Sequence, residues 1–110
     1  MIEDRRSGQE RRAADRFAVK IDVEWERAKG RFSGSVSDMS FDGCFVLCSG
    51  DVDDGETVSL FIPLADGMKV QFNGRVTNHV LEIGFGLKFD PLTTGQRDVL
   101  AKMAAQAEKG

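Results

Sequence analysis

The sequence is poor in the residues that catalysis and metal binding use most. Its 110 residues include one histidine, His79, and no tyrosine. The two cysteines, Cys44 and Cys48, lie in a short apolar run, and on a strand they would be about 13 Å apart, beyond the reach of a disulfide. We therefore expect reduced core cysteines. A Cys–His nucleophile pair would need one of these core cysteines beside His79. One histidine and two cysteines fall short of the about four ligands of a zinc site, so we expect neither an enzyme nor a metal centre.

Long apolar stretches are also absent. No run approaches the roughly 18 apolar residues of a membrane helix, and the first 16 residues lack the apolar core of a secretory signal. The net charge of −3 and the sequence pI of about 5.1 argue against a protein that coats nucleic acid. We expect one cytoplasmic domain, without membrane insertion and without a nucleic acid polymer as partner.

Apolar and polar residues alternate along most of the chain. The alternation is strict from Phe17 to Glu26 and predicts a strand with one buried face. Shorter or weaker patterns follow at 32–40, 44–48, 58–64, 68–76 and 83–89, with an acidic loop at 49–56. Six strands with short connections indicate an antiparallel sandwich or barrel. Closure into a six-stranded antiparallel β-barrel removes the two exposed edges.

The period changes after Pro91. Thr93 and Gln96 match a capping box at the start of a helix. Apolar residues then follow at helical spacing: Val99, Leu100, Met103, Ala104 and Ala107. The sequence thus predicts an all-β domain with a C-terminal helix, in which residues 17–90 form the barrel and residues 91–110 a helix packed on it.

Two short motifs stand out. Residues 1–16 carry five arginines and few apolar side chains, so we expect a flexible arm. The arm ends in an RxxxR motif, Arg12 to Arg16, and a DxSxxG motif spans Asp38 to Gly43. Each motif is weak alone. Residues 27–31 also match RxxxR and are typical of a hairpin tip, and DxSxxG also suits a polar turn closed by a glycine.

Together the two motifs resemble the PilZ family in their order and in the strand between them. The last predicted strand, Ile83 to Phe89, is similar to the final barrel strand of that family, and the resemblance covers about residues 9–105. It implies a six-stranded antiparallel barrel with a C-terminal helix, and cyclic di-GMP as ligand. It further implies a receptor that changes conformation on binding and signals to a protein partner that the sequence does not identify. The alternative is a PilZ-like interaction adaptor that does not bind the nucleotide.

The resemblance also implies the ligand-binding residues. An arginine fork matches a phosphate or the O6/N7 edge of guanine, and a carboxylate can accept hydrogen bonds from guanine N1–H and N2–H. Two residues apart on a strand, Asp38 and Ser40 would share one face. The implied ligand-binding set is Arg11, Arg12, Arg16, Asp38, Ser40 and Gly43.

The residue before RxxxR bears on stoichiometry. In the family, an arginine at this position goes with a stacked dimer of cyclic di-GMP, so Arg11 implies two ligand molecules per chain. A third guanidinium suits this ligand because it can neutralise phosphate and lie against an outer guanine. Asn78 and His79, near a predicted loop, stay open as further ligand contacts.

Overall fold

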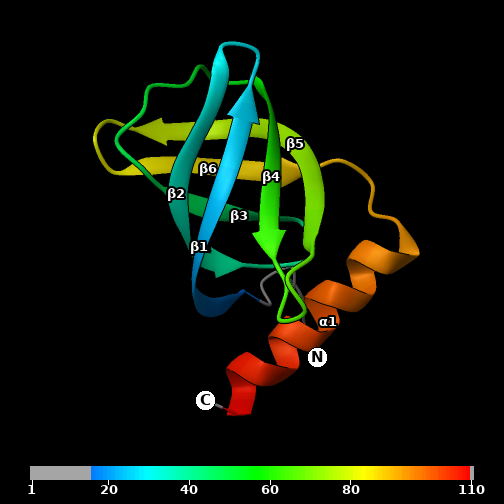
Figure 1. Cartoon of the computed structure of the whole chain (residues 1–110). Coiled ribbons are helices and arrows are strands. Elements are labelled where there is room, and N and C mark those ends of the chain that lie inside the picture. Colours follow the sequence, from blue (N-terminus) through cyan, green and yellow to red (C-terminus); the bar gives the residue numbers. More distant parts are fainter. Residues whose placement is uncertain (1–15, 110) are drawn as a thin grey trace, which may run out of the picture.

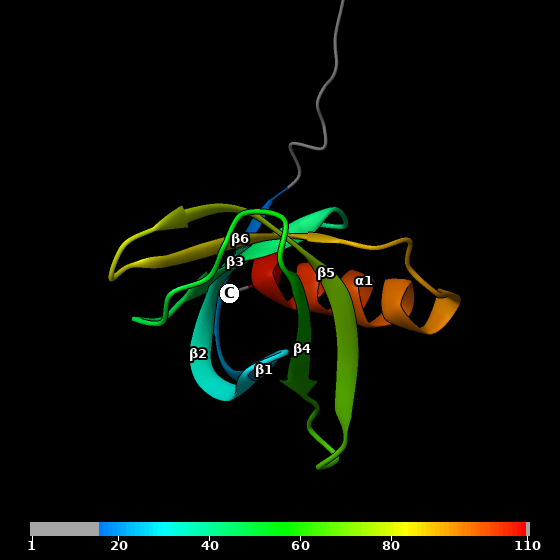
Figure 2. The same cartoon turned by 90° about the horizontal axis from the view of Figure 1, so that it is seen from above.

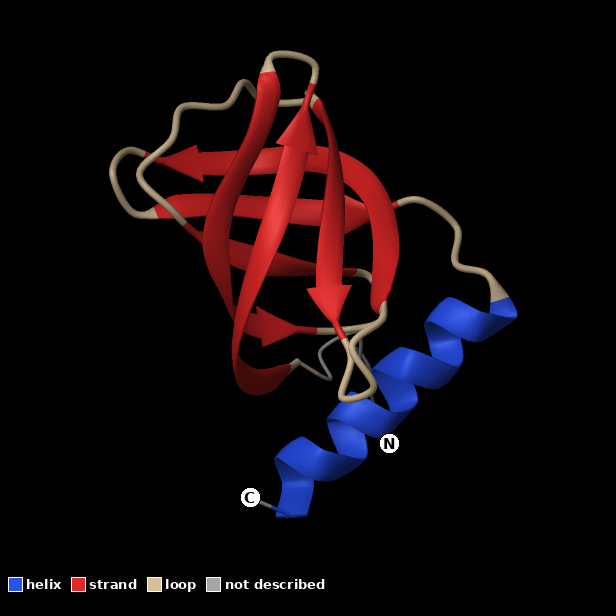
Figure 3. Cartoon of the chain, in the orientation of Figure 1, coloured by secondary structure: helices blue, strands red, loops and turns tan. Residues whose placement is uncertain are grey.

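The structure is a computed structural model that describes residues 16–109. Six strands form one closed barrel in the order β1-β2-β3-β6-β5-β4, with every neighbouring pair antiparallel and β4 pairing back onto β1 (Figures 1 and 3). This confirms the predicted six-stranded antiparallel barrel with a C-terminal helix. The elements are β1 (Phe17–Arg27), β2 (Gly30–Met39), β3 (Gly43–Leu47), β4 (Thr57–Pro63), β5 (Lys69–Val80), β6 (Gly84–Phe89) and α1 (Thr94–Lys109).

Side chains from all six strands fill the barrel interior. Trp25, Phe72 and Phe85 are its largest fully buried members. The ring centroids of Trp25 and Phe85 lie 5.0 Å apart in an edge-on arrangement, which aromatic pairs favour. Because close-packed side chains occupy the inside, the barrel interior has no room for a ligand of nucleotide size.

Alternation predicts inward side chains at the first residues of the patterns at 68–76 and 83–89, and both predictions were wrong. Met68 and Ile83 are 64% and 53% exposed, although each begins an alternating pattern. Both residues precede the strands that they were assigned to, β5 and β6 respectively. The turns that enter these strands point their side chains outward. Of the two cysteines, Cys44 is buried, whereas Cys48 is half-buried against the core, and both are free thiols.

The capping box at the helix start is confirmed. The backbone N–H of Gln96 donates to Thr93 Oγ1 (3.1 Å), and the N–H of Thr93 donates to Gln96 Oε1 (2.8 Å). The side chain of Leu100 is fully buried, and Val99 and Met103 pack against the core. The helix therefore lies against the barrel, as Figure 2 shows from above. None of the helical segments in residues 16–109 has the length and apolar character to cross a membrane.

Residues 27–31 form the tip of the hairpin between β1 and β2, as predicted, but Arg27 is not a solvated tip residue. Its side chain is 11% exposed, its Nε and Nη2 donate to the two carboxylate oxygens of Glu56 (2.6 and 2.9 Å), and its Nη1 donates to the carbonyl of Asp51 (2.6 Å). Burial raises the pKa of Glu56, but the N–H of Asp53 and Arg27 outweigh it, so this pKa lies below its usual value. Arg27 thus ties the acidic loop to the barrel.

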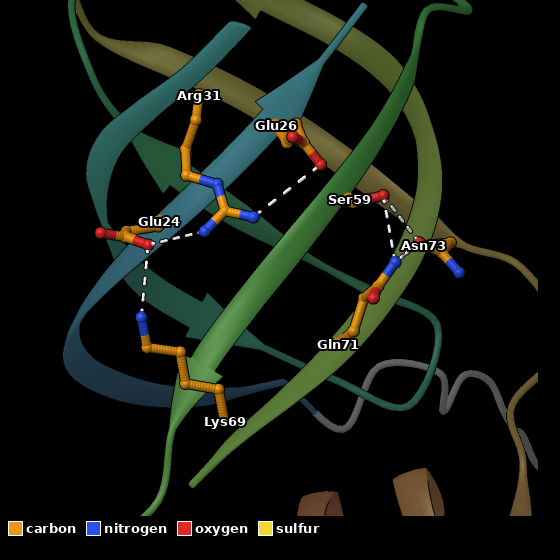
Figure 4. A network of polar contacts seen from close by, with 7 residues as sticks. All are labelled: Glu24, Glu26, Arg31, Ser59, Lys69, Gln71 and Asn73. Carbon is orange, nitrogen blue, oxygen red and sulfur yellow. Dashed lines mark hydrogen bonds and ion pairs between the residues drawn. The ribbon is translucent and has the colours of Figure 1, made fainter. Parts of the chain in front are cut away.

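Replacing Arg27 is expected to destabilise the fold. Arg27→Ala leaves Glu56 without its charged partner, at a cost of about 1–3 kcal/mol in urea unfolding. Arg31→Ala is the matched control because Arg31 is 47% exposed and pairs with Glu24 on the surface (Figure 4), so it should cost less than about 1 kcal/mol.

The effect of Arg27→Ala should also depend on pH. The pKa of Glu56 is lower in the folded protein than in the unfolded chain, where it is near 4.5. The ionised carboxylate therefore stabilises the fold at pH values above 4.5, and this stabilisation is lost as the pH falls through the folded pKa. The difference between wild type and Arg27→Ala should therefore shrink below pH 4.5. Equal unfolding midpoints for Arg27→Ala and Arg31→Ala at pH 7 would contradict the assignment.

Candidate binding site

Strand pairing brings the two sequence motifs together. A continuous row of paired residues crosses β1, β2, β3, β6 and β5, and it consists of Ala18, Asp38, Phe45, Gly86 and Asn78. Arg16, the last residue of RxxxR, directly precedes β1. The row therefore places the end of the arm, the start of DxSxxG and the outer surface of β6 and β5 on one side of the barrel.

Arg16 and Asp38 form an ion pair. The Nε and Nη2 of Arg16 both donate to Asp38 Oδ1, with Nε at 3.1 Å. The two side chains are 50% and 39% exposed, and ion pairs exposed to this degree contribute about 0–1 kcal/mol to folding. The pair contributes little to the fold, and both groups stay accessible to a ligand.

A hollow of about 230 Å³ opens beside this ion pair. It is smaller than the roughly 300–1,000 Å³ of pockets that enclose a drug-sized ligand, so it can hold only part of a dinucleotide. Its walls come from the end of the arm, the turn before β3, and strands β3, β5 and β6: Arg16, Asp42, Gly43, Cys44, Phe45, Thr77, Asn78, Gly86, Leu87 and Lys88.

Ser40 does not share a strand face with Asp38, contrary to the expectation from their spacing. β2 ends at Met39, and Ser40 is 3% exposed in the turn that follows. Its Oγ accepts hydrogen bonds from the backbone N–H groups of Asp42 (3.1 Å) and Gly43 (3.3 Å). Ser40 therefore closes the turn between β2 and β3, as Ser/Thr turns do.

Gly43 permits a close approach between strands. A Cβ atom at this position would lie 2.0 Å from the carbonyl oxygen of Leu87 on β6. Gly43 does not have a left-handed backbone conformation, so the glycine is required for space and not for unusual backbone angles. It lines the hollow, and its contact with β6 fixes one wall of it.

The structure describes two of the four remaining candidate contacts, Asn78 and His79. Arg11 and Arg12 lie outside the described residues. Asn78 lines the hollow, whereas His79 is half-buried and does not. The Nε2 of His79 has no hydrogen-bond partner in the part of the chain that the structure describes.

The chemistry of the hollow suits binding. Burial, with the charge of Asp38, raises the pKa of the Cys44 thiol to about 12, so this thiol is not a nucleophile at neutral pH. Residues 16–109 contain no group of His, Cys, Asp and Glu side chains that could hold a metal ion. The polar side chains that line the hollow remain, two cations, one carboxylate and two neutral groups: Arg16, Lys88, Asp42, Thr77 and Asn78.

Sequence reasoning missed Thr77 and Lys88. Strand β5 carries a bulge between Val76 and Asn78, and Thr77 is the extra residue. The sequence contains one signal of this bulge. Polar Asn78 occupies a position at which the alternation of Phe72 and Val76 predicts an apolar side chain. A break of this kind within a strand is typical of a bulge.

Comparison with known proteins identifies the family of the chain. The family model of the PilZ domain matches residues 10–106, and the chain therefore belongs to the PilZ family. No curated protein matches the sequence significantly.

Solved structures share the fold. The PilZ domain of CeSA from a cellulose-synthesizing bacterium is 21% identical, with a TM-score of 0.66 over 84% of this chain and 97% of that one. The Bacillus subtilis inhibitor of motility MotI/DgrA is 16% identical, with a TM-score of 0.69. Borreliella burgdorferi PlzA, solved in complex with c-di-GMP, is 11% identical, with a TM-score of 0.66. Each match covers 84% of this chain, but only 48% of MotI and 40% of PlzA.

Gly43→Ala is expected to destabilise the barrel. The added methyl group meets backbone on β6, which cannot rotate away, and overpacking of this kind costs about 1–3 kcal/mol. Gly95→Ala is the control because its Cβ would meet nothing closer than Thr93 Oγ1 at 3.9 Å, and it should leave the thermal midpoint unchanged or slightly raised. An unchanged midpoint for Gly43→Ala would show that β3 and β6 do not approach this closely.

Proposed function

We propose that this protein is a cyclic di-GMP receptor that binds the dinucleotide without transforming it. In this proposal, binding changes the conformation of the protein and signals to a protein partner. One observation carries the proposal: Arg16 of RxxxR lies against Asp38 of DxSxxG, 22 residues away, at the edge of a hollow on the barrel surface. Membership of the PilZ family and the fold shared with PlzA, which was solved with c-di-GMP, support it.

The chemistry of the ligand fits these groups. Cyclic di-GMP has two phosphates and two guanines. Arg11, Arg12 and Arg16 can each donate two parallel hydrogen bonds to a phosphate or to the O6/N7 edge of a guanine. Asp38 can accept from guanine N1–H and N2–H. Because the exposed pair of Arg16 and Asp38 is weak, exchanging it for ligand contacts costs little.

Ser40 and Gly43 have a second role in this proposal. Their turn holds Asp42 and the start of β3 at the rim of the hollow. Both residues therefore shape the surface on which the ligand rests, whether or not they touch it. The free cysteines suit a cytoplasmic receptor, because the cytosol keeps thiols reduced.

An exposed apolar patch supports the signalling part of the proposal. Leu47 and Val80 both pair with Gly84. Each of these three residues lies two positions along its strand from a member of the row, on the same outer face. With the adjoining turn they form a group of exposed side chains next to the hollow: Leu47, Val80, Leu81 and Ile83. Clustered apolar residues on a surface are typical of protein interaction sites. A PilZ-like adaptor that does not bind the nucleotide is the alternative that this patch leaves open.

The first test is calorimetric titration with cyclic di-GMP. Arg12→Ala, Arg16→Ala and Asp38→Ala should each weaken binding by about tenfold to a hundredfold, because each removes hydrogen bonds to a charged group. Arg31→Ala, on the far hairpin, is the control and should bind like wild type, and a single-stranded oligonucleotide should give no binding. Absence of binding by the wild-type protein would favour the adaptor that does not bind the nucleotide.

The second test concerns stoichiometry. We expect two molecules of cyclic di-GMP per chain, since Arg11 supplies the additional charge that a stacked dimer with four phosphates needs. In Arg11→Leu the ratio should fall from about two toward one, while Arg12 and Arg16 retain part of the affinity. A ratio of one in the wild type would disprove this proposal, whatever the variant does.

A further inference from the structure

The bulge in β5 turns two neighbouring polar side chains to the same side of the barrel. Phe72 and Val76 point inward in regular alternation. Thr77 is then inserted, so Thr77 and Asn78 are both exposed and the inward direction resumes only at His79. The Oγ1 of Thr77 lies 3.1 Å from Asn78 Oδ1, within hydrogen-bond distance. The bulge thus fixes an amide group on the outer surface, next to Arg16 in the hollow.

Gly86 makes room for this amide. A Cβ atom at Gly86 would lie 2.3 Å from Asn78 Oδ1 and 2.8 Å from Thr77 Oγ1. The two side chains therefore lie across the backbone of β6, where any other residue would displace them. The Nδ2 of Asn78 has no hydrogen-bond partner within the described part of the chain, so the amide keeps free hydrogen-bonding capacity at the hollow.

Two cations stand beside this amide. Lys88 on β6 lines the same hollow and pairs across the sheet with Arg75 on β5. Both side chains are exposed, and neither has an ion-pair partner among residues 16–107. Like charges directly opposite each other on neighbouring strands are destabilising. Asp42 lines the same hollow but forms no ion pair with either cation in the described part of the chain, so a bound anion would offset this repulsion.

We propose that Asn78 binds the edge of a guanine and that Lys88 and Arg75 bind a phosphate of the same ligand. A carboxamide presents one acceptor and two donor hydrogens, which complement the N1–H donor and O6 acceptor of guanine. Adenine carries the reverse pattern, a donor at N6 and an acceptor at N1, which an amide turned by 180° would match. The hydrogen bond from Thr77 Oγ1 to Asn78 Oδ1 opposes that turn, and in the orientation it holds Asn78 favours guanine over adenine. The proposal rests on the cyclic di-GMP function proposed above and assigns the barrel wall of that site.

The structure supplies matched controls nearer the start of β5, on the same outer face but outside the hollow. Asn73 accepts from Ser59 Oγ and Gln71 Nε2, both at 2.8 Å, and Lys69 donates to Glu24 Oε1 at 3.3 Å (Figure 4). These residues repeat the chemistry of Asn78 and Lys88 outside the hollow. Asn73→Ala and Lys69→Gln therefore control for changes in charge, polarity and expression.

The experiment is titration of full-length variants with cyclic di-GMP and cyclic di-AMP, with a thermal melt of each variant. Asn78→Ala should weaken cyclic di-GMP binding about tenfold and reduce its preference over cyclic di-AMP. Gly86→Ala, which displaces the amide, should reproduce this result. Lys88→Gln and Arg75→Gln should each weaken binding about tenfold and make it less sensitive to salt. Asn73→Ala and Lys69→Gln should stay within about twofold of wild type.

The outcomes separate the two proposals. If wild type binds cyclic di-GMP and Asn78→Ala and Lys88→Gln bind as tightly as the controls, the barrel wall does not read the ligand and the inference is overturned. It is overturned as well if Asn78→Ala weakens cyclic di-GMP and cyclic di-AMP equally, because the amide then does not recognise guanine. If wild type shows no binding, the receptor function itself fails.

Discussion

The close pairing of β6 with β3 is the constraint on which both the barrel and its site depend. A Cβ atom at Gly43 or at Gly84 would lie 2.0 Å from a backbone oxygen of the facing strand. These glycines stand at the two ends of the pairing, and only residues without a side chain let the strands approach this closely. β6 also pairs with β5. The position of β6 therefore sets which residues of β3 and β5 face each other across Gly86.

Three register shifts explain how the same strands serve a core and a surface site. They adjoin Ala18 on β1, Asp38 on β2 and Asn78 on β5, which are all members of the row that crosses the site. A bulge changes the direction of the side chains that follow it. β2 and β5 can thus direct apolar side chains inward along most of their length and still present polar Asp38 and Asn78 where the row crosses them.

The sequence was sufficient for the fold but only for part of the site. Alternation and the Thr93–Gln96 capping box identify all six strands and the helix, because burial and local hydrogen bonds determine these patterns. Alternation cannot identify the face of a residue beyond a bulge, since one extra residue reverses every later assignment. For this reason Asn78 could be placed near the site but not in it. The assignment of Ser40 to the face of Asp38 failed because β2 ends one residue earlier.

A protein with a net charge of −3 can attract an anionic ligand only where carboxylates do not cancel its cations. On β1, at the start of β2 and at the start of β5, basic residues lie within 4.0 Å of acidic ones: Arg27 with Glu56, Arg31 with Glu24 and Glu26, and Lys69 with Glu24. Lys88 and Arg75 have no such partner among residues 16–107, and Arg16 has only a weak exposed pair. The field that a phosphate encounters at the hollow is therefore the sum of Arg16, Lys88 and Arg75 against the carboxylates of Asp38 and Asp42 on the same side. The pairing of these cations thus matters more than their number.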